Sequence, residues 1–577
     1  MSSYGYDRSG ARGGAMPFQK YRAFAPIDLP DRTWPTKTIT EAPRWCSVDL
    51  RDGNQALIDP MRPDEKLRFW NLLVQMGFEE IEAGFPAASQ TDFDFFRKLI
   101  DEDLIPDRVY VQALCQMREE LIQRTVDAFV GVPRAIFHIY NSTSTLQRDV
   151  VFGMTRDQIK GLAVQGVEWV LKEIERIPDT EVVLEYSPES FTGTELDFAV
   201  DVCSAVAQRW GAGPGRKMII NLPATVEMST PNIYADQIEW FCRNLPERAH
   251  CVISLHTHND RGTGVAASEL GLMAGADRVE GTLFGNGERT GNLDIVIVAL
   301  NMNSHGIETG LDFSDLSSIR QVYEETTRME VPERQPYAGE LVFTAFSGSH
   351  QDAIKKGFDR RTCEVAESSE EVAWGVPYLT IDPKDIGRSY EAIIRINSQS
   401  GKGGVAYVLD REHGFDLPKS MHPQVGKFVY DKADAAGREL SNDEIGELFF
   451  EEFVNIDSPL SLEQFELDHT AGGVGEVLCH ATVKLGSEEM KGVGKGNGPI
   501  NAFVHFLGKV GRKDFAVTDY RSQALRGGSD ADSAAYVQVK HARNGTLLWG
   551  CGIDSSIEMA GLKALICAWN LLRDWEE

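Results

Sequence analysis

Three side chains of the kind that bind divalent metals stand at the ends of two apolar runs in this sequence. His256 lies near the end of the run 251–257 and His258 follows it directly, and side chains two apart on a strand point the same way. Asp52 follows the run 45–50 and adds a carboxylate. Two imidazoles and a carboxylate form a metal-binding set. The alternatives are polar residues at a strand end and an aspartate that caps a helix or pairs with Arg51.

Other polar side chains follow neighbouring runs. Glu185 and Glu189 flank Ser187, and either carboxylate could act as a general base or form part of a salt-bridged rim. His138, at the end of another run, could bind an anionic group or be a core histidine. Asn292 ends the glycine-rich segment 285–292 and could add an oxygen ligand, although a tight turn also explains the glycines.

The elements that must position these residues alternate between strands and helices. Eight short apolar runs suit parallel strands that are covered on both faces. They are residues 45–50, 79–84, 108–114, 134–140, 181–186, 216–222, 251–257 and 277–284. Helical spacing of apolar residues lies between them, as in Leu67, Trp70, Leu73 and Val74.

The number of units predicts a (β/α)₈ TIM barrel. Residues 45–304 hold eight strand–helix units, which fits the roughly 250 residues of a typical barrel. Active sites of such barrels gather at the C-terminal ends of the strands, where the polar residues above fall. A doubly wound open sheet is the alternative, but it favours a glycine-rich turn after the first strand. Here that turn, residues 51–55, is polar and charged.

The chain has 577 residues, so we expect more than one domain. The predicted divisions are an N-terminal extension (1–44), the barrel (45–310), linker subdomains (311–430) and a C-terminal α+β domain (431–577). In the last, residues 477–507 and 534–566 resemble each other, each with two predicted strands, a glycine-rich turn and a helix. These duplicated ββα units suggest a small-ligand cleft. The turn at 492–498 does not complete a phosphate-loop motif.

Composition narrows the partners and the compartment. A net charge of −29 opposes binding to nucleic acid or to an anionic membrane surface. The sequence has no apolar run of about 18 residues, and we expect no membrane-spanning helix. The first 40 residues lack the apolar stretch of a secretory signal, and the nine cysteines form no Cys-x-x-Cys pair. A cytoplasmic location follows as the expectation.

Three segments together resemble one family. SVDLRDGNQALIDPM (47–61), HTHNDRGTGVAASELG (256–271) and EGTLFGNGERTGN (280–292) are similar to signature segments of the DRE-TIM metallolyase-like superfamily. Within it, the chain resembles the long form of the 2-isopropylmalate synthase family over nearly its whole length. The resemblance implies a Claisen condensation of acetyl-CoA with 2-oxoisovalerate, then thioester hydrolysis to 2-isopropylmalate and CoA in leucine biosynthesis. It also implies that the C-terminal domain binds leucine as a feedback inhibitor.

The resemblance also assigns roles to residues. The metal-binding positions match Asp52, His256, His258 and Asn292, and the contacts to the keto acid match His138, Ser187 and Thr225. Arg51 matches an arginine that stabilises negative charge on the keto oxygen, and Glu189 matches a catalytic glutamate. His350, in segment 346–357, matches a histidine that reaches the partner subunit's active site, which implies a homodimer.

Several choices stay open at this point. The divalent metal is expected to be Mg²⁺, Mn²⁺ or Zn²⁺, and it would chelate the keto acid and polarise its carbonyl. His350 and Glu189 are the candidates for the base that deprotonates the acetyl methyl group. The nearest alternatives are homocitrate synthase, which uses 2-oxoglutarate, and citramalate synthase, which uses pyruvate. A carbon–carbon lyase and a non-catalytic leucine sensor are more distant ones.

Overall fold

The computed structural model describes residues 18–345, 347–368, 371–390, 404–436, 440–468, 475–525 and 532–574. The chain divides into two compact units. The first comprises residues 1–342 and 381–389, and the second comprises residues 343–380 and 390–577. Among the described helices, none is both long enough and apolar enough to cross a membrane.

The first unit is built on a closed barrel of eight parallel strands in sequence order, which confirms the predicted architecture. Strand β1 pairs with β8 and closes the ring. The strands are β1 (Arg44–Ser47), β2 (Glu80–Gly84), β3 (Tyr110–Gln116), β4 (Arg134–Ser142), β5 (Glu181–Glu189), β6 (Met218–Ala224), β7 (Cys251–Thr257) and β8 (Arg278–Gly281).

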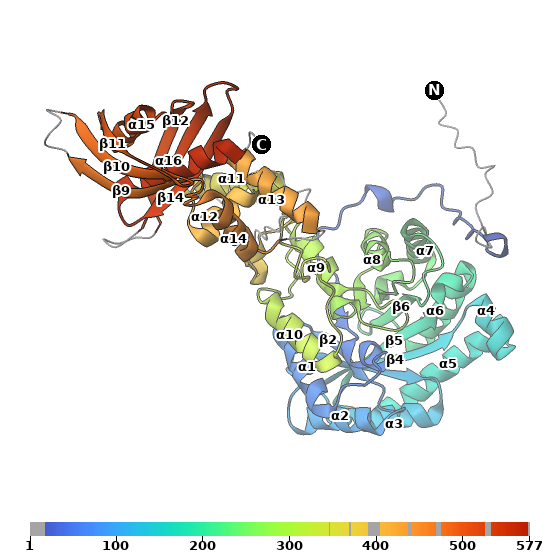
Figure 1. The fold of residues 1–577 in the computed structure, drawn as a ribbon. Helices are drawn as coiled ribbons and strands as arrows, with labels where there is room; N and C mark the ends of the chain where they lie inside the picture. Colours follow the sequence, from blue (N-terminus) through green and yellow to red (C-terminus); the bar gives the residue numbers. More distant parts are fainter. Residues whose placement is uncertain are drawn as a thin grey trace, which may run out of the picture. The chain divides into compact units, whose positions relative to one another are not determined.

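One helix follows each strand, and these helices lie around the outside of the barrel (Figure 1). They are α1 (Pro63–Met76), α2 (Gln90–Asp101), α3 (Glu119–Phe129), α5 (Arg156–Glu173), α6 (Leu196–Trp210), α7 (Pro231–Asn244), α8 (Gly264–Met273) and α9 (Ile295–Asn303), with the short α4 (Thr145–Gln147) before α5 and α10 (Leu316–Thr327) against α1. Helix α1 shows why the pattern works. Pro63 opens it, Gly77 ends it in the left-handed region, and Phe69, Trp70 and Leu73 are buried.

The interior of the barrel is strongly polar, which the apolar runs did not predict. Glu80 and Glu82 lie two residues apart on β2, and Arg278 and Glu280 lie two residues apart on β8. All four side chains are buried. The Arg278 guanidinium lies 2.5 Å from a Glu80 oxygen and 2.8 Å from a Glu280 oxygen. Residues two apart on a barrel strand face the same side, so these charges share the interior.

The second unit begins with α11 (Gly348–Glu367) and continues with α12 (Gly404–His413), α13 (His422–Ala436) and α14 (Asn442–Phe453). Two three-stranded antiparallel sheets follow, in the orders β11-β10-β9 and β12-β13-β14. The first half comprises β9 (Leu460–Asp468), β10 (Val477–Leu485), β11 (Glu488–Gly496) and α15 (Pro499–Lys509), and the second comprises β12 (Phe515–Ala524), β13 (Ser533–His541), β14 (Leu547–Asp554) and α16 (Ile557–Asp574). The predicted strand–strand–helix order of each half is present, while β9 and β12 were not predicted.

Glycines let each helix lie directly against its sheet. A Cβ atom on Gly494 would stand 1.9 Å from the carbonyl oxygen of Ala502, and one on Gly552 would stand 2.1 Å from that of Ala560. In both halves, glycines on a strand therefore allow the helix to approach the sheet closely. The predicted turn at 492–498 is wrong over most of its length, because β11 extends to Gly496 and its glycines accommodate α15.

Candidate active site and metal centre

Asp52 reaches the barrel mouth from a tight turn. The first strand ends at Ser47, and a single π-helical turn, η3 (Asp49–Gly53), carries Arg51 and Asp52. The predicted run 45–50 therefore extends past the strand into this turn, and Asp52 lies in the turn rather than at a strand end. The Asp49 carboxylate holds the turn, since it accepts hydrogen bonds from Ser47 Oγ (2.8 Å) and from the backbone N–H of Leu283 (3.0 Å). The turn is thereby tied to the loop after β8.

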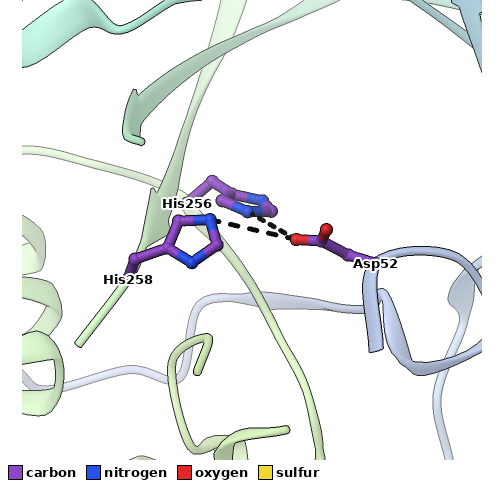
Figure 2. A group of neighbouring side chains, drawn as sticks. All are labelled: Asp52, His256 and His258. Carbon is purple, nitrogen blue, oxygen red and sulfur yellow. Dashed lines mark ion pairs between the residues drawn. The ribbon is translucent and has the colours of Figure 1, made fainter. Parts of the chain in front are cut away.

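The two histidines meet Asp52 at this mouth. His256 lies on β7 and His258 follows its end, and both imidazole rings are turned toward the aspartate (Figure 2). Asp52 Oδ2 lies 3.2 Å from His256 Nε2 and 3.9 Å from His258 Nε2. One potential ligand atom from each of the three buried residues lies within 4.8 Å of the others. A single ion fits a cluster of this size and composition.

Asn292 is paired with His258 through the backbone. The two residues form an antiparallel β-bridge, and the Asn292 amide nitrogen donates to the Asn286 carbonyl at 3.0 Å. Its buried Oδ1 atom has no hydrogen-bond partner among the described residues. Leaving such an acceptor unpaired costs about 1–3 kcal/mol, and a cation would remove that cost. The donor set of carboxylate, two imidazoles and amide oxygen therefore fits a divalent metal.

The protonation states of Asp52, His256 and His258 also favour a metal site. Burial opposes the ionisation of Asp52, but Arg51 and His256 outweigh it and hold its pKa well below the usual value. Burial and the neighbouring His256 lower the pKa of His258 to about 4, so its imidazole is neutral and able to bind a metal. Burial would lower the pKa of His256 as well, but hydrogen bonds with Asp52 and Glu280 raise it to about 9. Without a metal, His256 therefore carries a proton on Nε2, the atom that faces Asp52 and would otherwise bind the metal.

A carboxylate inside the barrel orients His256. Glu280 Oε2 lies 2.8 Å from His256 Nδ1, which leaves Nε2 directed at Asp52. Arg278 and Asn221 in turn hold Glu280, at 2.8 and 3.0 Å. Such outer partners fix the tautomer of a ligand histidine. Glu280 was not predicted as a site residue, because a single charge inside the short run 277–284 does not reveal that the barrel interior is polar.

Arg51 links the metal cluster to a second buried group. Its guanidinium lies 3.0 Å from Asp52 Oδ1 and 2.5 Å from Glu82 Oε2. These carboxylates raise its pKa even though burial works against the charge. Arg51 is therefore a fixed cation at the mouth of the barrel. Glu82 was also missed by the sequence reasoning, for the same reason as Glu280.

A cavity of about 390 Å³ opens at this mouth. Eight of the ten predicted site residues line it, namely Arg51, Asp52, His138, Ser187, Glu189, Thr225, His256 and His258. Glu189 accepts a hydrogen bond from Ser142 Oγ at 2.6 Å, and Thr225 Oγ1 accepts one from the Ser190 N–H at 2.9 Å. Leu114, Tyr140 and Pro223 add apolar wall that the sequence reasoning did not identify. The roles of all these residues stay predictions.

Some placements differ from expectation. Glu185 does not lie at the rim, because it is fully buried inside the barrel, 3.3 Å from Arg278. His138 lies within β4, four residues before its end, and also faces this interior. His350 lies in the first turn of α11 in the second unit, where its ring stacks on that of Tyr378 with the ring centroids 4.2 Å apart. Its role in the site stays a prediction.

Comparison with known proteins identifies the family. Residues 42–322 match the family described as HMGL-like, residues 340–410 match the alpha-isopropylmalate synthase post-catalytic domain-like family, and residues 439–573 match the LeuA allosteric (dimerisation) domain. A 2-isopropylmalate synthase of Parafrankia sp. is 54% identical, covering 96% of this chain and 97% of that protein. Those of Thermobifida fusca and Rhodospirillum rubrum are 53% and 52% identical, covering 98% and 99% of those proteins. The chain therefore belongs to the 2-isopropylmalate synthase family.

Proposed function

We propose that this protein condenses acetyl-CoA with 2-oxoisovalerate and hydrolyses the resulting thioester, giving 2-isopropylmalate and CoA. The main support for this proposal is that relatives named 2-isopropylmalate synthase are more than 50% identical to this chain over nearly their whole length. The site agrees with it, since a buried metal-binding cluster, a fixed arginine and a cavity occur together. The reaction would be a step of leucine biosynthesis in the cytoplasm.

The metal centre is proposed to consist of Asp52, His256, His258 and Asn292. A divalent ion bound there supplies Lewis acidity to the keto group and fixes the keto acid in one orientation. Mg²⁺, Mn²⁺ and Zn²⁺ are the candidates, because carboxylate, amide oxygen and imidazole suit each of them. Arg51 would stabilise the negative charge that develops on the keto oxygen during carbon–carbon bond formation.

The keto acid is proposed to lie against His138, Ser187 and Thr225. Leu114 and Pro223 line the same cavity and offer apolar surface to a branched side chain. The added carboxylate of 2-oxoglutarate would need a further cation. Arg289 lines the cavity, but its Nε atom lies 2.7 Å from Asp260, which already balances its charge. The pocket thus favours 2-oxoisovalerate over the substrate of homocitrate synthase.

Deprotonation of the acetyl methyl group requires a base. Glu189 and His350 are the proposed candidates, acting directly or through water. Glu189 lines the cavity, whereas His350 would come from the partner subunit of a homodimer. The match to an allosteric dimerisation domain supports that assembly. We propose that residues 45–310 form the catalytic domain, 311–430 the linker and 431–577 the leucine-binding regulatory domain, after an extension of residues 1–44.

Product identification tests the proposal. Purified protein, freed of metal with a chelator and then given Mg²⁺, Mn²⁺ or Zn²⁺, is incubated with acetyl-CoA and 2-oxoisovalerate. Mass spectrometry is expected to find 2-isopropylmalate and free CoA only when metal is restored. Formation of free CoA without 2-isopropylmalate, or equal turnover with and without metal, would contradict the assignment.

A further inference from the structure

A carboxylate, an imidazole and a hydroxyl beside the metal cluster are joined by two successive hydrogen bonds. Glu82 Oε1 lies 2.9 Å from His138 Nδ1, and His138 Nε2 lies 2.7 Å from Ser187 Oγ. All three side chains are at least 95% buried, and His138 and Ser187 line the cavity. Carboxylate–histidine–serine arrays with these spacings move protons in many hydrolytic sites.

The direction of each hydrogen bond follows from Glu82. Burial would raise the pKa of Glu82, but Arg51 and His138 hold it below its usual value, so the carboxylate is ionised. It can then only accept, and His138 must carry its proton on Nδ1. The free lone pair on Nε2 accepts the Ser187 hydroxyl proton, while the Asn221 amide donates to Ser187 Oγ at 3.1 Å. One lone pair of Ser187 Oγ is left to accept from a water in the cavity.

We propose that Glu82, His138 and Ser187 form a proton relay for the thioester hydrolysis that ends the reaction, an inference that rests on the proposed function. A cavity water gives a proton to Ser187 Oγ as the Ser187 proton passes to His138 Nε2. The water oxygen bonds to the thioester carbonyl carbon. The carbon–sulfur bond then breaks, CoA leaves as a thiolate, and the proton on His138 returns through Ser187 to neutralise it. The product carboxylic acid releases one proton to solvent.

The surroundings of His138 suit a transient positive charge. The ionised Glu82 lies 2.9 Å from its Nδ1 atom, and the carboxyl oxygen Oε1 of Glu185 lies 3.5 Å from Nε2 and could accept a hydrogen bond from the protonated ring. Glu82 acts through His138 and is a positioning residue, since it fixes the tautomer that makes Nε2 a base. In this relay Ser187 passes a proton and does not itself become acylated.

Single-turnover rapid quench separates the two halves of the reaction. Wild type, Ser187→Ala and Glu82→Gln are mixed with acetyl-CoA and 2-oxoisovalerate, and mass spectrometry follows free CoA and the condensed thioester, 2-isopropylmalyl-CoA. Loss of a general base costs about 10²–10⁴-fold, so both variants are expected to accumulate the condensed thioester. Thr225→Val is the matched control, because it removes another hydroxyl from the same cavity. It is expected to weaken substrate binding without accumulation.

Ser187→Ala keeps the test clean, because it leaves the ion pair between Glu82 and Arg51 in place. Release of CoA in step with condensation in both variants would overturn the relay while the proposed function stood. An acyl group on Ser187 of quenched wild type would also overturn it, in favour of direct attack by the serine. Wild type that forms neither the condensed thioester nor 2-isopropylmalate would instead refute the proposed function.

Discussion

Replacing Glu280 with glutamine tests whether the barrel interior sets the affinity of the metal site. Both carboxylate oxygens are saturated with donors: Arg278 and Gln112 approach Oε1 at 2.8 and 3.2 Å, and His256 and Asn221 approach Oε2 at 2.8 and 3.0 Å. A glutamine NH₂ group would face two donors in either orientation.

This clash between donors is expected to weaken metal binding through its effect on His256. If the new NH₂ group faces His256, the imidazole must carry its proton on Nε2, the atom directed at Asp52. If the group faces Arg278, a buried cation loses an acceptor. Loss of such an outer partner typically weakens metal binding by roughly 10–100-fold. Glu280→Gln is therefore expected to cost about 1.4–2.7 kcal/mol of metal-binding free energy.

Calorimetric titration of the chelator-treated protein measures this directly. Glu185→Gln is the matched control, because Glu185 is equally buried and also lies beside Arg278, at 3.3 Å, but among the described residues it forms no hydrogen bond with His256. Burial raises the pKa of Glu185 well above its usual value, so a neutral amide is a close substitute. Equal metal affinity in Glu280→Gln and Glu185→Gln would refute the reasoning.

Three further predictions concern the ligands, the turn that carries them and the regulatory domain. His258→Ala is expected to lose metal affinity and nearly all turnover, and normal metal content by elemental analysis would disprove its role. Burial raises the pKa of Asp49 to about 7, so the fold loses stability as pH rises from about 4 to 7, by roughly 4 kcal/mol. Asp49→Asn should lose less between pH 5 and 8 in urea unfolding of metal-free protein; equal losses would contradict this. A chain ending at residue 421, before α13, should lose leucine inhibition, with its mass checked for the dimer. Persistent inhibition would refute the regulatory assignment.

The sequence allowed the barrel to be predicted because its strands are apolar runs that alternate with amphipathic helices. All eight predicted runs overlap strands, with bounds that differ by a few residues. The turn at Asp49–Gly53 was not predictable, since a π-helical turn depends on the tertiary contact between Asp49 and the backbone of Leu283. Strand β12 was missed because most of its side chains are exposed and it lacks an apolar face.

Some residues of the candidate site could also be predicted from the sequence, and others could not. Residues at the mouth were found because their types are unusual at strand ends, as with His256 and His258. Glu82 and Glu280 were missed, because single charges inside short apolar runs do not reveal that a barrel interior is polar. Their partners lie on other strands, so only the closed barrel brings them together.

The rate of CoA release with a panel of keto acids tests the central claim most directly. Full-length protein is assayed with acetyl-CoA and 2-oxoisovalerate, pyruvate or 2-oxoglutarate, with metal present and after chelation. The account predicts the highest kcat/KM for 2-oxoisovalerate and loss of turnover on chelation. Faster turnover of pyruvate or 2-oxoglutarate, or turnover that survives removal of the metal, would contradict it.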